Sequence, residues 1–98
     1  MIKVNVKTNE ITISGHAYND ISGKDIVCAS VSSIVIATIN AIIRIDKDAI
    51  VYEEKDGYIK INNLKKDNIT NALLINMIEL LRELVSKYPK NIIMKEDK

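Results

Sequence analysis

Apolar and polar residues alternate at the start of the chain. Every second residue is apolar in residues 2–6 and again in residues 11–13, with a short polar segment between them. A period of two is typical of strands that bury one face, and two such strands joined by a polar turn predict a β-hairpin. We therefore expect a hairpin that ends near Ser14 and Gly15.

An uncharged, mostly apolar segment at residues 26–43 follows a polar loop at residues 16–24. On a helix its apolar side chains lie on nearly all sides. The segment therefore predicts a helix from about residue 25 to about residue 45, covered by other elements on most sides. Ser22 or Asp25 is expected to cap its N-terminus.

The same segment is long enough to be considered as a membrane span. Four hydroxyl residues and Asn40 interrupt it, and Asp25 and Arg44 at its ends show no basic bias. These features favour a helix inside a small α/β domain, and we predict no membrane association.

The second half of the chain begins with another hairpin. Residues 49–52 and 58–61 have the composition of strands, and Asp56 and Gly57 lie between them. The Asp-Gly pair is a strong signal for a tight turn between two strands.

An amphipathic helix follows, from Asp67 or Asn68 to about residue 88, where Pro89 ends it. Charged residues lie opposite a wide apolar stripe, which is typical of a helix packed on a sheet. The stripe comprises Leu73, Leu74, Met77, Ile78, Leu81, Leu84, Val85 and Tyr88. Residues 91–94 are expected to add a short final strand.

This order of elements, β-β-α-β-β-α with a possible last strand, predicts an α+β fold. The simplest way to bury the apolar faces is a two-layer sandwich, with both helices on one face of a mostly antiparallel sheet. No internal repeat or linker divides the chain, so we expect residues 1–98 to form a single domain.

Composition narrows the possible functions. The 98 residues carry a formal net charge of +1, and the 4% of aromatic residues are all tyrosine. Neither a basic field nor stacking platforms are available, so nucleic-acid binding is not expected. One cysteine allows no internal disulfide, and the strand-like N-terminus lacks the apolar run of a signal peptide. We therefore predict a cytoplasmic protein.

The only histidine, His16, and the only cysteine, Cys28, lie twelve positions apart. The predicted helix places Cys28 in its first turn, where free amides and the helix dipole favour an anion. Those amides could also hold the oxyanion of a tetrahedral intermediate. Asp25, Cys28 and Ser32 share one face of the helix, and His16 comes from the end of the preceding strand. An imidazole beside such a thiol is the arrangement of a cysteine nucleophile and its base.

Each of these residues also has a structural explanation. Cys28 can be a small core residue, and His16 a hydrogen-bonded loop residue. Asp25 can serve only as a helix cap, Ser32 can bond the carbonyl one turn back, and Gly15 can simply terminate a strand. The remaining possibility is a metal site formed by His16, Asp20, Asp25 and Cys28. Its spacing matches no common zinc pattern, so we predict neither a metal nor another cofactor.

The residues around this pair closely resemble the signature of the ribosomal-processing cysteine protease (Prp) family. The matching positions are Gly15-His16-Ala17, Gly23, Asp25-Ile26-Val27-Cys28-Ala29 and Val31-Ser32. The motif is long and ordered, although residue-level matching is confined to residues 15–32. Tyr18 and Ser30 depart from the residues that the family often has there, which affects the shape of the substrate groove rather than a catalytic group.

The resemblance implies a cysteine endopeptidase that removes the N-terminal extension of large-subunit ribosomal protein twenty-seven during ribosome assembly. It implies that Cys28 is the nucleophile and His16 the general base, supported by Asp25, Ser32 and Gly15. It also implies a homodimer. Two other hypotheses stay open from the residues alone: a non-enzymatic dimeric binding module in ribosome assembly, and a redox-sensing thiol, which would lack a resolving cysteine in the chain.

Overall fold

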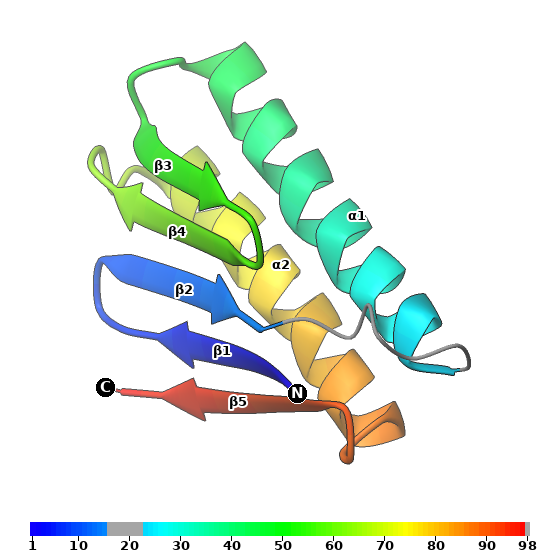
Figure 1. The fold of residues 1–98 in the computed structure, drawn as a ribbon. Coiled ribbons are helices and arrows are strands. Elements are labelled where there is room, and N and C mark those ends of the chain that lie inside the picture. The colour runs from blue at the N-terminus through cyan, green and yellow to red at the C-terminus, as the bar shows by residue number, and fades with distance from the viewer. Residues whose placement is uncertain (16–22, 98) are drawn as a thin grey trace.

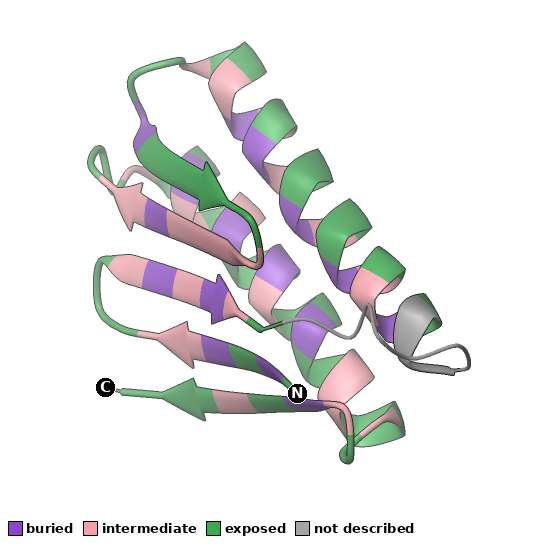
Figure 2. Cartoon of the chain, in the orientation of Figure 1, coloured by how far each residue is buried: buried purple, intermediate pink, exposed green. Residues whose placement is uncertain are grey.

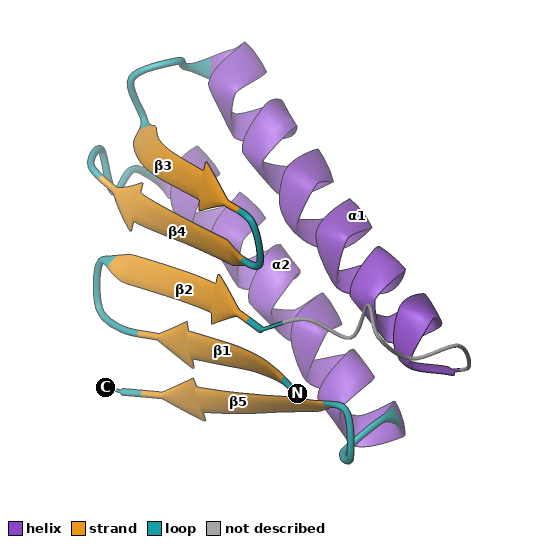
Figure 3. Cartoon of the chain, in the orientation of Figure 1, coloured by secondary structure: helices purple, strands orange, loops and turns teal. Residues whose placement is uncertain are grey.

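The computed structural model describes residues 1–15 and 23–97 of the chain, with the side chains of 23–25 excluded. Two helices lie on one face of a five-stranded sheet (Figures 1 and 3). This confirms the predicted two-layer α+β fold. The elements are β1 (Ile2–Val6), β2 (Glu10–Ser14), α1 (Gly23–Ile45), β3 (Ile50–Lys55), β4 (Tyr58–Asn63), α2 (Asn68–Lys87) and β5 (Ile92–Glu96).

The strand order across the sheet is β3-β4-β2-β1-β5, and all neighbours are antiparallel except β1 and β5. Both predicted hairpins are present, as β1–β2 and β3–β4. The expected last strand is present as well and runs parallel to β1, with Ile2 opposite Ile92. Pairing of β2 with β4 places Ser14 opposite Tyr58, so the end of the first hairpin meets the turn of the second.

The core lies between the sheet and the inner faces of the two helices (Figure 2). Helix α2 buries Leu74, Met77 and Leu81 from its predicted apolar stripe. Helix α1 contributes a buried residue at nearly every fourth position: Val27, Val31, Val35, Ile39 and Ile42. This spacing matches the period of one helix face, so both helices pack on the sheet as amphipathic elements.

The prediction that α1 is covered on most sides is wrong. Only 28% of its most apolar window is buried, and Ile26 and Ile36 are 61% and 42% exposed. The reason is the two-layer architecture, in which the sheet covers one side of α1 and α2 flanks it, with no third layer in the described chain. By length and composition, α1 is the one helix in the described residues that could cross a membrane; core helices of soluble proteins meet the same criterion.

The start of α1 also differs from the prediction. The helix begins at Gly23, so Asp25 is its third residue and not its cap. Ser22, the other predicted cap, lies outside the described residues. Cys28 is therefore the sixth helical residue and falls in the second turn rather than the first. Helical side chains lean toward the N-terminus, so a side chain at this position covers the first turn.

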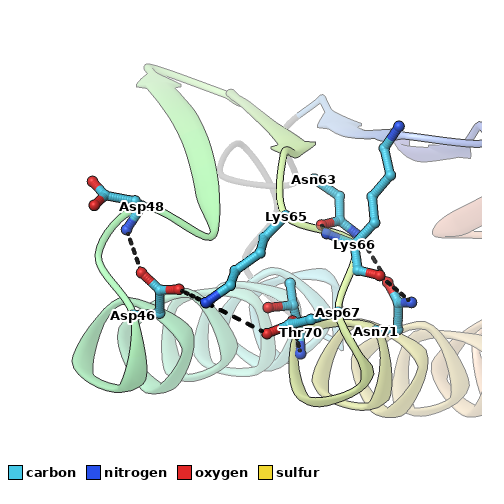
Figure 4. Close-up of polar contacts among 8 residues, drawn as sticks. All are labelled: Asp46, Asp48, Asn63, Lys65, Lys66, Asp67, Thr70 and Asn71. Carbon is cyan, nitrogen blue, oxygen red and sulfur yellow. Dashed lines mark hydrogen bonds and ion pairs between the residues drawn. The ribbon is translucent and has the colours of Figure 1, made fainter.

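A polar junction joins the end of α1 to the start of α2 (Figure 4). Lys65 forms an ion pair with Asp46, just after α1, and its Nζ lies 3.8 Å from Asp67 Oδ2. Asp67 is the N-cap of α2, as predicted, and accepts a 3.0 Å hydrogen bond from the Thr70 amide. Asp46 in turn accepts a 2.9 Å bond from the Asp48 amide. One lysine thus connects the two helix ends.

The electrostatics of this junction follow from its hydrogen bonds. The bond from Lys65 holds the pKa of Asp46 below its ordinary value, and the bond to Asp46 raises the pKa of Lys65. The hydrogen bonds from Thr70 lower the pKa of Asp67. Each charged form is therefore favoured by the folded state.

A second set of contacts fixes the chain between β4 and α2 (Figure 4). The Asn63 amide nitrogen donates to Asn71 Oδ1 at 2.9 Å, and Asn63 Oδ1 accepts from the Lys66 amide at 3.0 Å. Lys66 has a positive φ of 55°, a conformation that costs free energy for a residue with a side chain. The asparagine contacts stabilise this sharp change of direction ahead of α2.

Candidate active site

The half-buried thiol of Cys28 lines a cavity of about 120 Å3 between the N-terminal part of α1 and the sheet. Gly15 and Ser32 line the same cavity, so three of the five predicted site residues meet there. The other lining residues are Ile2, Ile13, Val31, Glu54, Lys55, Gly57, Tyr58 and Ile59. The cavity therefore has an apolar floor from the core and a more polar rim from the second hairpin.

Cys28 lies at the border between the core and the cavity. Its neighbour Val27 is fully buried, whereas Cys28 packs against the core with part of its surface open. The thiol is free, so no disulfide blocks its chemistry. A partly open thiol beside the first turn of a helix can act as a nucleophile, which a sulfur sealed in the core cannot do.

Ser32 lies one turn after Cys28, exposed and at the wall of the cavity. The structural explanation for this serine, a bond to the carbonyl one turn back, is realised elsewhere in the described part of α1, by the Thr38 hydroxyl with the Ile34 carbonyl at 2.8 Å. The Ser32 hydroxyl takes no part in such a bond among the described residues. It is therefore available to a group in the cavity.

Gly15 does more than end a strand. It adopts a positive φ of 101°, and a Cβ added to it would lie 2.2 Å from the carbonyl oxygen of Met1. Both the backbone conformation and this close approach require glycine. The Gly15 amide donates a 2.9 Å hydrogen bond to the Gly57 carbonyl, which holds the end of β2 against the β3–β4 turn.

Sequence reasoning missed the contribution of this turn. Lys55, Gly57 and Tyr58 line the cavity, although they lie about thirty positions from Cys28. The Asp-Gly signal locates the turn, but only the pairing of β2 with β4 brings it to Gly15. That pairing joins strands that are not consecutive, so no local pattern reveals it.

Two of the predicted site residues are not tested by the structure. His16 lies outside the described residues, as do Tyr18 and Asp20. Only the helical backbone of Asp25 is described. The Cys28–His16 pair therefore stays a prediction. The described residues contain no group of three or more His, Cys, Asp or Glu side chains placed to hold a metal ion.

Solved structures of known proteins share this fold. A ribosomal processing protease, Prp, from S. aureus in complex with a substrate peptide has a TM-score of 0.90 and 24% identity, covering 99% of this chain and 100% of its own. The same protein with a covalently linked product peptide has a TM-score of 0.88 at the same identity and coverage. A protein from Streptococcus mutans has a TM-score of 0.78 and 24% identity, covering 97% of this chain and 90% of its own. At this level of identity these likenesses establish the fold.

The family follows from the sequence over nearly its whole length. No curated protein matches the chain. The model of the family described as cysteine protease Prp matches residues 1–93, which include both hairpins, both helices and the cavity around Cys28. The chain belongs to the cysteine protease Prp family.

Proposed function

We propose that this chain is a cysteine endopeptidase that uses Cys28 as nucleophile and His16 as general base. The observation that carries the proposal is the cavity in which the open thiol of Cys28 meets Gly15. Gly15 is the residue directly before His16, and its conformation is fixed by the bond to Gly57. Membership of a cysteine protease family supports the same assignment.

The proposed reaction proceeds in two stages. His16 takes the proton of the Cys28 thiol, and the sulfur bonds to the scissile carbonyl carbon. The carbon–nitrogen bond then breaks as His16 gives its proton to the leaving amine, which leaves a thioester on Cys28. Water attacks this thioester while His16 takes its proton, and the sulfur leaves as the carboxylic acid product forms.

Three further groups support this chemistry. The free amides in the first turn of α1 hold the oxyanion, since the Cys28 side chain leans toward that turn. The Ser32 hydroxyl, one turn along α1, can donate to the sulfur anion. Asp25, on the same helix face, orients His16. These roles extend the resemblance of the motif to the residues of this chain.

The proposed substrate is the N-terminal extension of large-subunit ribosomal protein twenty-seven, removed in the cytoplasm during ribosome assembly. The family assignment supports a protein substrate. The S. aureus structures, described as a ribosomal processing protease with substrate and product peptides, support a peptide that comes from a ribosomal protein.

We also propose that the chain acts as a homodimer. The support is the uncovered side of α1, which forms with α2 a groove of about 490 Å3. Its apolar lining includes Ile26, Ala29, Ile34, Leu80 and Leu84. An exposed apolar surface of this kind marks an interaction site on a soluble protein, and a symmetric pair is the commonest form of self-association.

The experiment is to mix the protein with a peptide that copies the extended N-terminus and to identify products by mass spectrometry. Wild-type protein is expected to cleave at one bond, and Cys28→Ala and His16→Ala are expected to leave the peptide intact. Ser33→Ala is a matched control, because Ser33 lies on α1 beside Ser32 but lines the outer groove. Cleavage by Cys28→Ala would end the proposal.

Alkylation of the thiol at pH 6 separates the enzyme from the non-enzymatic alternative. An activated sulfur should react within the folded protein, whereas an inert core thiol should react only after unfolding. Slow alkylation together with an intact peptide would favour the binding module.

A further inference from the structure

A second hollow continues the Cys28 cavity along the seam between α1 and β3. It has a volume of about 80 Å3 and is lined by Ile36, Ile39, Asn40, Tyr52, Glu54 and Ile59. Glu54 and Ile59 also line the cavity around Cys28. The two hollows therefore share a wall and form one groove, which we call the α1–β3 seam.

Strand β3 forms one side of the seam and is an edge of the sheet. Within the described chain it pairs with β4 alone. Every second residue of an edge strand directs its N–H and C=O groups away from its partner, which is a template for another extended chain. Tyr52 and Glu54 face the seam, and the alternation of a strand turns Val51 to the opposite face of the sheet.

The dimensions of the seam suit an extended peptide. Cys28 and Ile36 are eight residues apart on α1, which corresponds to about 12 Å along the helix. An extended chain covers this distance in about four residues. A peptide with its scissile bond at Cys28 would therefore place a side chain about four positions away in the hollow between Ile36 and Tyr52.

The chemistry of the hollow indicates which side chain it takes. Ile36 is an exposed apolar residue on the helix, and the ring of Tyr52 on β3 is 44% exposed. Ile39 and Ile59 complete an apolar lining, with Asn40 and Glu54 as its polar members. Exposed apolar surface in a hollow is stabilised by covering it with an aliphatic side chain.

We propose that the α1–β3 seam is the substrate groove: an extended peptide adds as a strand to the free edge of β3 and inserts an aliphatic side chain, about four residues from the scissile bond, between Ile36 and Tyr52. This inference rests on the proposed peptidase function. The continuity of the hollow with the Cys28 cavity argues for the substrate as the occupant, because a peptide that leaves that cavity on this side must cross the seam.

The test measures binding without turnover. Fluorescence anisotropy gives the Kd of a labelled substrate peptide for Cys28→Ala protein, alone and combined with Tyr52→Ala or Ile36→Ala. Either change is expected to weaken binding about tenfold, equivalent to about 1.4 kcal/mol. Val51→Ala is the matched control, because Val51 neighbours Tyr52, is similarly exposed at 50% and lies on the other face. Circular dichroism checks that each variant is folded.

Two peptide series locate the contact. Replacing single residues by glycine on both sides of the scissile bond should reveal one sensitive aliphatic position about four residues away, and Tyr52→Ala should remove that sensitivity. N-methylation of successive amides should weaken binding at alternate positions, as strand pairing requires. Equal Kd values for Tyr52→Ala, Ile36→Ala and Val51→Ala, or a flat response to N-methylation, would overturn the proposal.

The outcome for the groove is separate from that for the peptidase. If wild-type protein cleaves the peptide while Tyr52→Ala and Ile36→Ala bind it normally, the groove proposal fails and the peptidase stands. If the peptide binds with the expected dependence on Tyr52 but is never cleaved, the groove stands and the peptidase fails.

Discussion

The Gly15 amide donates a 2.9 Å hydrogen bond to the Gly57 carbonyl, and this bond joins the two hairpins at the rim of the Cys28 cavity. Both glycines have positive φ angles, 101° and 74°. The first hairpin thereby delivers its end to the turn of the second, and the next residue after Gly15 is His16. The position of the predicted base relative to the thiol thus depends on a glycine pair outside the helix that carries the nucleophile.

Replacing Gly15 by alanine should destabilise the protein and abolish cleavage. The new Cβ would meet the Met1 carbonyl oxygen at 2.2 Å, and a positive φ costs a residue with a side chain about 1–3 kcal/mol before that clash is added. Urea unfolding should therefore show a loss of at least about 2 kcal/mol. Ser14→Ala, one residue earlier on β2, is the control and should change stability by less than about 1 kcal/mol. Equal stability of Gly15→Ala and Ser14→Ala would contradict the role assigned to Gly15.

Replacing Ser32 by alanine should slow the reaction while leaving the fold unchanged. Ser32 is exposed at the cavity wall one turn from Cys28, and a hydrogen bond to a charged group contributes about 1.5–3 kcal/mol. We expect kcat to fall by about tenfold or more, with a small change in KM and an unchanged unfolding midpoint. Ser33→Ala should keep the wild-type kcat. A loss of stability without a loss of kcat would show that Ser32 is structural.

Local patterns predict the elements of this fold because their causes are local. Alternation identifies β1 and β2, the Asp-Gly pair identifies the second hairpin, and the cap at Asp67 begins α2 as expected. The pairing of β2 with β4 and the parallel pairing of β5 with β1 depend on packing across the sheet. For that reason the turn residues of the cavity rim could not be foreseen.

The prediction for α1 failed for a related reason. An uncharged, apolar helix suggests complete coverage, but coverage depends on the number of layers, which is a property of the whole fold. In two layers only the face of α1 that contains Val27 and Val35 is buried. The residues of the site could be predicted because the motif lies in one stretch around Cys28, whereas the α1–β3 seam requires a strand that is distant in sequence.

Stability should decrease at both acidic and strongly alkaline pH because of the junction between the helices. The folded state lowers the pKa of Asp46 and Asp67, so their contribution is fully present above the unfolded value of about 3.9 and is lost as pH falls through the lowered values. Lys65 has a raised pKa, so its contribution is present below about 10.4 and is lost as pH rises through the raised value.

Urea unfolding of wild type and Lys65→Met at a series of pH values checks this prediction. Between pH 5 and pH 9 the variant should be the less stable protein, and the difference should shrink below pH 4 and above pH 10.5. Added salt should also reduce the difference, because these groups are exposed to solvent. Lys47→Met, in the same connection but outside the ion pair, is the control. A difference between Lys65→Met and wild type that does not vary with pH would contradict the ion-pair explanation.

The outer groove between α1 and α2 should be the surface through which two copies associate. Leu80 lines this groove from α2 and is 38% exposed. A lysine there would place a charge inside the apolar contact, which costs free energy because the charge must lose its water. Leu80→Lys is therefore expected to convert a dimer into a folded monomer in light scattering after size-exclusion chromatography. Leu64→Lys is the control, because Leu64 is also exposed, at 57%, but lies near the polar junction away from the groove. Dissociation by Leu64→Lys, or a dimer that survives Leu80→Lys, would place the interface on another face.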